Sequence, residues 1–227
     1  MVREITLLVT LMSSAAWAAD PYPAMAPIEQ YRSPGRDAEI ALARSAAPPS
    51  ISNDAEILVF GAKGYETAAP GKNGFTCLVE RSWGADFDAP EFWNPKIRGP
   101  LCFNAAATHS ILPLYRQHTE WALAGISRDE MLKRTRTAVA AGQIAPPEPG
   151  AMCYMMSKDA YLSDDGGPGG HWHPHLMFYL PRTEETAWGS NQKQSPVFGG
   201  PLMVEPTSLF IVTVPNWSDG SPGPMGH

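Results

Sequence analysis

Three histidines alternate along a short stretch of the chain, and their spacing could support metal chemistry. His171, His173 and His175 lie in the run GGPGGHWHPHLMFYL. In an extended chain, residues two apart point to the same face about 6.5 to 7 Å apart, so neighbouring imidazoles can converge on one ion. The preceding glycines and Pro174 favour a bend or a strand edge, which would bring in the third ring. The sequence therefore predicts a three-histidine metal site. His173 is expected to matter most, since it alone can pair with either neighbour.

The ion expected at such a site is a transition metal, with zinc favoured over copper. Both metals bind imidazole nitrogen, and an exported protein can meet either one. If the site is catalytic, hydrolysis of a small molecule by metal-activated water is the simplest chemistry, because zinc lowers the pKa of bound water to about 7. The competing interpretation is structural: two histidines face solvent or make hydrogen bonds, while Trp172 and Leu176 contact the core.

Further ligands for the ion could come from elsewhere in the chain, and the sequence does not choose among them. The candidates are Glu80, Asp164, Asp165, His109 and His118. Glu80 precedes Arg81, a pattern more typical of an ion pair on a strand surface. His118 lies at helical spacing from Trp121, which favours packing or a satisfied interior group.

Aromatic residues suggest an alternative function. Trp83, Phe87, Phe92 and Trp93 gather in one long loop. Tryptophans recur near the C-terminus at Trp172, Trp188 and Trp217. Flat apolar rings bind sugars and other ligands, so the chain could be a non-catalytic envelope or secreted binding module that holds a glycan, a peptide or a partner protein. The competing interpretation is that these rings close a core beneath long loops.

Several function classes lose support from the sequence. The chain has no Gly-rich phosphate loop followed by lysine and serine, no Gly-x-Ser-x-Gly elbow and no His-Glu-x-x-His helix. Its formal net charge of -6 lacks the positive field that nucleic acid requires. We therefore expect no nucleic-acid partner, and a small-molecule or glycan ligand is the favoured partner. The oligomeric state is left open.

The N-terminus has the order of a signal peptide. An apolar run from residue 5 to 12 follows Arg3 and Glu4, and small residues lead to Ala16 and Ala18. Residues 1–18 are therefore predicted to be a signal peptide, residues 19–54 a proline- and alanine-rich arm, and residues 55–227 one globular domain. The mature protein is expected in the periplasm or outside the cell, without integral membrane association, because the apolar run is too short to cross a bilayer.

The three cysteines permit at most one internal disulfide. Cys77, Cys102 and Cys153 each lie in an apolar run, where a free thiol packs as a small hydrophobic group. Export permits a bridge without requiring one, and three pairings are open.

The elements that would position these residues are mixed. Short apolar runs predict strands near 55 to 60, 75 to 82, 152 to 156, 176 to 180 and 208 to 214, and YETAA is a further strand candidate. Helical periodicity is confined to two segments near 111 to 124 and 128 to 141, the second opened by a capping box at Ser127 and Glu130. Strands on both sides of one helical pair predict an α+β fold: a mainly antiparallel sheet with a helical hairpin packed on it and long ordered loops.

Overall fold

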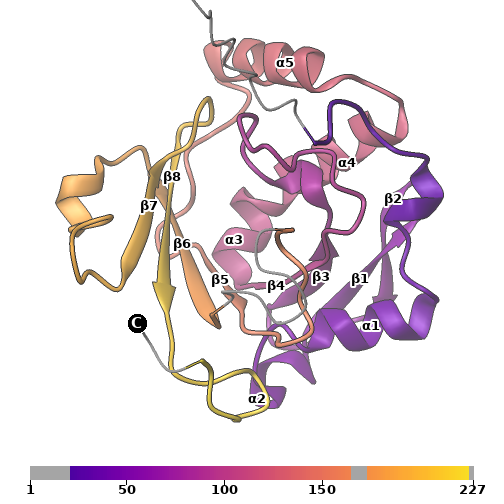
Figure 1. The fold of residues 1–227 in the computed structure, drawn as a ribbon, viewed down its shortest axis with the longest axis vertical. Coiled ribbons are helices and arrows are strands. Elements are labelled where there is room, and N and C mark those ends of the chain that lie inside the picture. Colours follow the sequence, from indigo (N-terminus) through magenta and orange to yellow (C-terminus); the bar gives the residue numbers. More distant parts are fainter. Residues whose placement is uncertain (1–20, 165–172, 225–227) are drawn as a thin grey trace, which may run out of the picture.

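The computed structural model describes residues 21–164 and 173–224, and within them the chain forms an eight-stranded sheet with helices on both faces (Figure 1). The strand order is β2-β1-β3-β4-β5-β6-β8-β7. The strands are β1 (Glu56–Gly61), β2 (Gly64–Ala69), β3 (Thr76–Glu80), β4 (Gly99–Phe103), β5 (Met152–Met155), β6 (His175–Pro181), β7 (Val197–Pro201) and β8 (Thr207–Thr213). Of their pairings only β1 with β3 is parallel. The predicted α+β class is confirmed.

Helices occupy the N-terminal part and the middle of the chain. They are α1 (Arg36–Arg44), α2 (Pro49–Ser52), α3 (Ala105–Ser110), α4 (Leu112–Leu123) and α5 (Arg128–Ala140), with short 3-10 turns η1 (Ile28–Tyr31), η2 (Ser82–Gly84) and η3 (Glu185–Trp188). The two helices expected from periodicity are α4 and α5. Ser127 caps α5 as its sequence pattern predicts, because its hydroxyl accepts the backbone N–H of Glu130 at 3.3 Å.

Strands β4 and β7 were not expected, and their composition explains why. Strand β4 reads GPLCF and β7 reads VFGGP, so each contains proline and glycine, which are depleted in strands. Strand β7 forms the edge of the sheet, where proline is tolerated. Strand β4 is interior and is fully buried along its length, so its pairing with β3 and β5 outweighs its low propensity.

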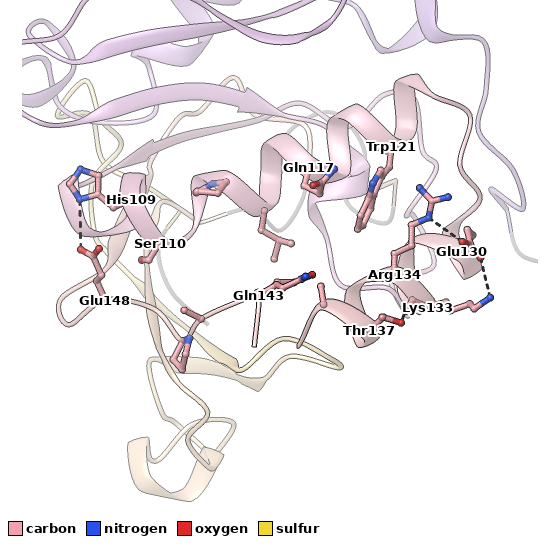
Figure 2. A pocket seen from close by; sticks show the side chains of 16 residues that line it. His109, Ser110, Gln117, Trp121, Glu130, Lys133, Arg134, Thr137, Gln143 and Glu148 are labelled. Atoms are coloured by element: carbon pink, nitrogen blue, oxygen red, sulfur yellow. Dashed lines mark hydrogen bonds and ion pairs between the residues drawn. The ribbon is translucent and has the colours of Figure 1, made fainter. Parts of the chain in front are cut away.

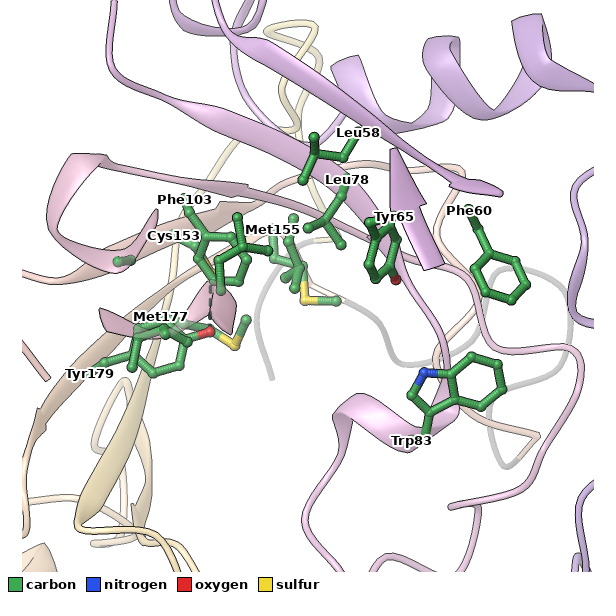
Figure 3. Close-up of a cluster of buried hydrophobic side chains, with 14 of the residues drawn as sticks. Leu58, Phe60, Tyr65, Leu78, Trp83, Phe103, Cys153, Met155, Met177 and Tyr179 are labelled. Atoms are coloured by element: carbon green, nitrogen blue, oxygen red, sulfur yellow. Dashed lines mark hydrogen bonds between the residues drawn. The ribbon is translucent and has the colours of Figure 1, made fainter. Parts of the chain in front are cut away.

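Alternate residues of the strands build two separate cores. On one face, Ile57, Val79 and Cys102 form a cluster with Ala43 of α1 and with Ala46 and Ala47 just after it. On the other face, Leu58, Leu78 and Leu101 join side chains of α3 and α4 and the long loop after β3. Figure 3 shows part of this larger core, in which Met155, Met177 and Tyr179 from β5 and β6 lie near Phe103 of β4. The candidate site lies on this second face.

The aromatic loop after β3 contributes to this core. Trp83, Phe87, Phe92 and Trp93 are all at most 4% exposed. Tyr31 in the N-terminal segment is buried beneath them, and its hydroxyl donates to the carbonyl of Trp93 at 2.8 Å. These rings therefore close the core beneath the loop and leave almost no aromatic surface there for a glycan or peptide.

One disulfide joins the middle of the sheet. Cys77 of β3 and Cys102 of β4 are directly opposite each other in the antiparallel register, and they are bonded. Cys153 on β5 is a buried free thiol. Of the three pairings that the sequence left open, the structure contains this one.

Candidate functional site

A pocket of about 420 Å³ lies on the α3 and α4 face of the sheet. Its floor is made by alternate residues of neighbouring strands: Glu80 of β3, Met155 of β5, His175 and Met177 of β6, and Ile211 of β8. The sheet register fixes this floor, because His175 pairs with Met155 and Met177 pairs with Ile211. The walls come from the loops after β3 and β5 and are mostly apolar.

Two glycines make the space that the Glu80 carboxyl occupies. Gly99 pairs with Glu80 across the β3–β4 ladder, and a Cβ there would lie 2.6 Å from Oε1 of Glu80. A Cβ on Gly84 would lie 2.6 Å from Oε2. Both distances are too short for any real contact, so a larger residue at either position would displace the carboxyl. The sequence thus builds a niche for one acidic side chain.

Burial changes the acidity of this carboxyl. Desolvation raises the pKa of Glu80 to about 8, while a hydrogen bond donated by the hydroxyl of Tyr115 opposes this rise. The phenols of Tyr115 and Tyr65 and the thiol of Cys153 each interact electrostatically with this carboxyl. Burial raises the pKa of each of these groups, so all three are uncharged at neutral pH. Glu80 therefore stays protonated at neutral pH, and these three groups near it carry no charge.

The phenol beside Glu80 belongs to a polar chain inside the core. The hydroxyls of Tyr115 and Tyr179 are 3.5 Å apart, and the hydroxyl of Tyr179 is 3.6 Å from Sγ of Cys153. Figure 3 marks the second of these contacts. These contacts hold the Tyr115 hydroxyl in place next to the carboxyl.

His175 brings an imidazole into the same pocket. It is the first residue of β6 and is 6% exposed. Its Nδ1 lies 3.0 Å from the backbone oxygen of His173. A carbonyl oxygen only accepts, so Nδ1 carries the proton and Nε2 carries the lone pair. Desolvation lowers the pKa of His175 to about 4, the hydrogen bond to His173 raises it, and repulsion from the His173 ring lowers it. The imidazole is therefore neutral at neutral pH.

Arg81 also lines the pocket, but its guanidinium is committed elsewhere. Its nitrogens donate to the backbone oxygens of Tyr31 at 2.6 Å and Val79 at 2.5 Å, and to Oε2 of Glu39 at 2.8 Å. The ion pair with Glu39 is buried on both sides. The interpretation of Glu80 and Arg81 as a surface ion pair was wrong, because the partner of Arg81 lies on α1.

Two of the three predicted metal ligands, His173 and His175, lie in the part of the chain that the structure describes. His171 lies outside the described residues, His173 is half-buried just before β6, and His175 begins β6. Within residues 21–164 and 173–224, no three histidine, cysteine or acidic side chains are grouped as a metal site would require. The three-histidine site stays a prediction.

The other suggested ligands divide among different places. Glu80 shares the pocket with His175. Asp164 accepts hydrogen bonds from Tyr22 and Tyr161 and pairs with Lys96 at 2.5 Å, while Asp165 lies outside the described residues. His118 is buried against Phe87 and Trp121, with Nδ1 3.2 Å from the carbonyl of Trp83, as expected for a packing role.

A second, larger pocket of about 830 Å³ lies between α4 and α5 (Figure 2). Its charged groups are paired with one another at the surface. His109 lies 3.8 Å from Glu148, and Arg134 lies 3.0 Å from Glu130. Both pairs are largely exposed. A concave site that holds buried titratable groups with shifted pKa values is the stronger functional candidate, and this favours the pocket of Glu80 and His175.

Comparison of the chain with protein-family models, with curated proteins and with solved structures found no match. Across the ranges that the structure describes, none of the helices combines the length and apolar character needed to span a membrane.

Proposed function

We propose that the protein binds a small molecule in the pocket of Glu80 and His175 and catalyses proton transfer on it. Glu80 donates the proton, and Nε2 of His175 presents the lone pair that accepts one. The observation that carries this proposal is the placement of both side chains on one apolar pocket floor, with the carboxyl in a niche that Gly84 and Gly99 keep open.

The chemistry follows from the state of each group. A carboxyl with a pKa near 8 is still an acid at neutral pH, and its proton is available to an oxygen of a bound molecule. In enzymes, two titratable groups whose surroundings push their pKa values apart commonly serve as the acid and the base. For a carbonyl compound, a proton moves from the α-carbon to Nε2, the C–H electrons form a C=C bond, and the carbonyl oxygen takes the Glu80 proton. The enol returns by the reverse steps.

Deuterium exchange tests this proposal without knowledge of the natural substrate. Cyclohexanone and acetophenone in D₂O are followed by proton NMR as their α-hydrogens are replaced. General acid–base catalysis contributes about 10² to 10⁴ in rate, so Glu80→Gln and His175→Gln should each slow exchange by about 10² or more. Exchange by the wild type should also decline above about pH 8, where Glu80 loses its proton.

Glu120→Gln is the matched control, because Glu120 is an exposed glutamate on α4 away from the pocket. This variant should exchange both ketones at the wild-type rate. If wild type and Glu80→Gln exchange both ketones equally fast, the proton-transfer function is refuted.

A metal ion on the histidine cluster is the second candidate function, and the tautomer of His175 favours it. Histidines that bind metal commonly donate their other N–H to a backbone carbonyl, as Nδ1 of His175 does. Zinc held by His175, His173 and His171 would stand beside the small-molecule pocket and supply an activated water for hydrolysis.

Elemental analysis after zinc and copper reconstitution, on protein made without an affinity tag, tests this second candidate. Wild type should retain close to one equivalent, and His173→Ala and His175→Ala should lose most of it. His109→Ala, a change at an exposed histidine, should retain the metal. Absence of metal from reconstituted wild type, or equal content in all variants, would remove the metal site.

Export to an oxidising compartment is part of the proposal. The Cys77–Cys102 disulfide supports it, since such bonds persist mainly in secreted, periplasmic or extracellular proteins.

A further inference from the structure

We infer that the pocket of Glu80 and His175 selects an uncharged, mainly apolar molecule that carries a carbonyl or hydroxyl oxygen. This inference rests on the proposed function in that it concerns the same pocket. It adds the chemical class of the ligand, which the arrangement of charges around the pocket determines.

Among the described residues that line the pocket, no cationic side chain is available to an anionic ligand without giving up a buried partner. Arg81 is the cationic side chain among these described residues, and each of its three guanidinium nitrogens already donates a hydrogen bond, to Tyr31, Val79 or Glu39. Withdrawing Arg81 would leave Glu39 as a buried, uncompensated charge, which is strongly unfavourable. A carboxylate or phosphate in the pocket would therefore lose its water without gaining a counter-ion.

A cationic ligand is also disfavoured. Glu80 would have to ionise inside its niche to pair with the cation, against the desolvation that keeps it protonated. Glu91, at the wall, is held by the loop after β5, because its Oε1 accepts the backbone N–H of Asp164 at 2.7 Å and the hydroxyl of Ser163 at 3.5 Å. A protonated carboxyl instead donates one hydrogen bond, and a carbonyl or hydroxyl oxygen is the matching acceptor.

The remaining lining fits an apolar body of modest size. Met155 and Met177 lie on the floor beside Ile211, with Ile97 and Leu162 among the wall residues. Methionine side chains adapt to ligands of different shape. A volume of about 420 Å³ is toward the lower end of the range for small-molecule sites.

Methyl NMR of the full chain labelled with ¹³C-methionine measures binding directly. Three probes of similar size differ in charge: benzyl alcohol is neutral, benzoate is an anion and benzylamine is a cation. At pH 6.5, benzyl alcohol should shift the Met155 and Met177 methyl signals saturably, and the other two probes should bind at least tenfold more weakly. The Met155→Leu and Met177→Leu variants assign the two signals.

A matched pair of variants places the ligand. Ile211→Trp should fill the pocket and abolish the shifts, whereas Val212→Trp, one residue further on the opposite face of β8, should leave them intact. If Ile211→Trp does not fold, Ala89→Phe blocks the pocket from the loop side. Benzoate or benzylamine binding as tightly as benzyl alcohol, or no shift with any probe, would overturn the inference.

The binding result and the exchange result separate the two claims. Binding of benzyl alcohol without ketone exchange would refute proton transfer and leave the ligand class standing. Tight binding of benzoate together with Glu80-dependent exchange would refute the ligand class and leave proton transfer standing.

Discussion

Replacing Glu80 with glutamine should stabilise the protein at neutral pH. The carboxyl lies in an apolar niche where its charged form is disfavoured, and desolvation raises its pKa from 4.5 to about 8. Glutamine has nearly the same shape, cannot ionise and keeps an oxygen that accepts from Tyr115. The substitution therefore removes the cost of a buried carboxyl while the Gly84 and Gly99 niche stays filled.

The size and direction of the effect follow from proton linkage. Between pH 4.5 and about 8 the folded chain holds the Glu80 proton and the unfolded chain does not. The free energy of unfolding of the wild type therefore falls with rising pH by about 1.4 kcal/mol per pH unit in this interval. Above it, the destabilisation due to Glu80 no longer changes with pH. At pH 7 the loss is about 3 kcal/mol, a large part of the about 5 to 15 kcal/mol by which domains are stable.

Urea denaturation at pH 5, 6, 7 and 8 measures this difference. The free energies of unfolding of wild type and Glu80→Gln should agree within about 1 kcal/mol at pH 5 and diverge to about 3 kcal/mol at pH 7. Near neutral pH, the melting temperature of the variant should be higher by about 6 to 12 °C. Glu120→Gln should give a curve parallel to wild type. If the Glu80→Gln curve is also parallel, Glu80 ionises normally and the argument for a buried acid is wrong.

Three further outcomes are expected. Reduction of the Cys77–Cys102 disulfide, which closes a 25-residue separation, should lower the free energy of unfolding by about 3.5 kcal/mol. Denaturant titrations with and without dithiothreitol measure this change, and equal unfolding midpoints in the two titrations would contradict it. In the same assay, Arg81→Met should lower the free energy of unfolding by about 3 to 5 kcal/mol, because Glu39 is left buried and uncompensated. Adding Glu39→Leu should restore part of this loss, and a double variant no more stable than Arg81→Met would contradict a stabilising ion pair. Intact-mass analysis of exported protein should show cleavage after Ala18, and full-length protein found only in the cytoplasm would exclude export.

The strands and helices with strong periodic signals could be predicted from the sequence. The run EILVFG became β1, SLFIVTV became β8, and the capping box at Ser127 opened α5. Strands β4 and β7 escaped prediction because Pro100, Gly199 and Gly200 lower their intrinsic preference for a sheet. Long-range pairing determined these strands, and single-sequence patterns do not report it.

The sequence indicates only one of the two titratable residues that define the candidate site. The alternation around His175 drew attention to one side of the pocket, and that residue lies on its floor. The sequence indicates Glu80 only as a further ligand, and its position before Arg81 favours a surface ion pair. Nothing local in LVERSW shows that Arg81 turns to Glu39, which is 42 residues earlier in the chain. Sheet register, rather than sequence distance, brings Glu80 and His175 to one pocket.

The glycines around Glu80 give an independent reason to regard its placement as functional. A fold that needed only a stable core could place an apolar side chain at this position and any small residue at 84 and 99. Instead, Gly99 is the direct cross-strand neighbour of the carboxyl and Gly84 bounds it from the following turn. Glycine loses more conformational freedom on folding than other residues, and a buried carboxyl weakens the fold, so this arrangement carries two costs. Side chains that reduce stability at one position in a pocket are characteristic of sites kept for activity. Gly99→Ala should accordingly displace the Glu80 carboxyl and slow ketone exchange while the protein stays folded. Exchange at the wild-type rate in that variant would show that the niche has no part in the chemistry.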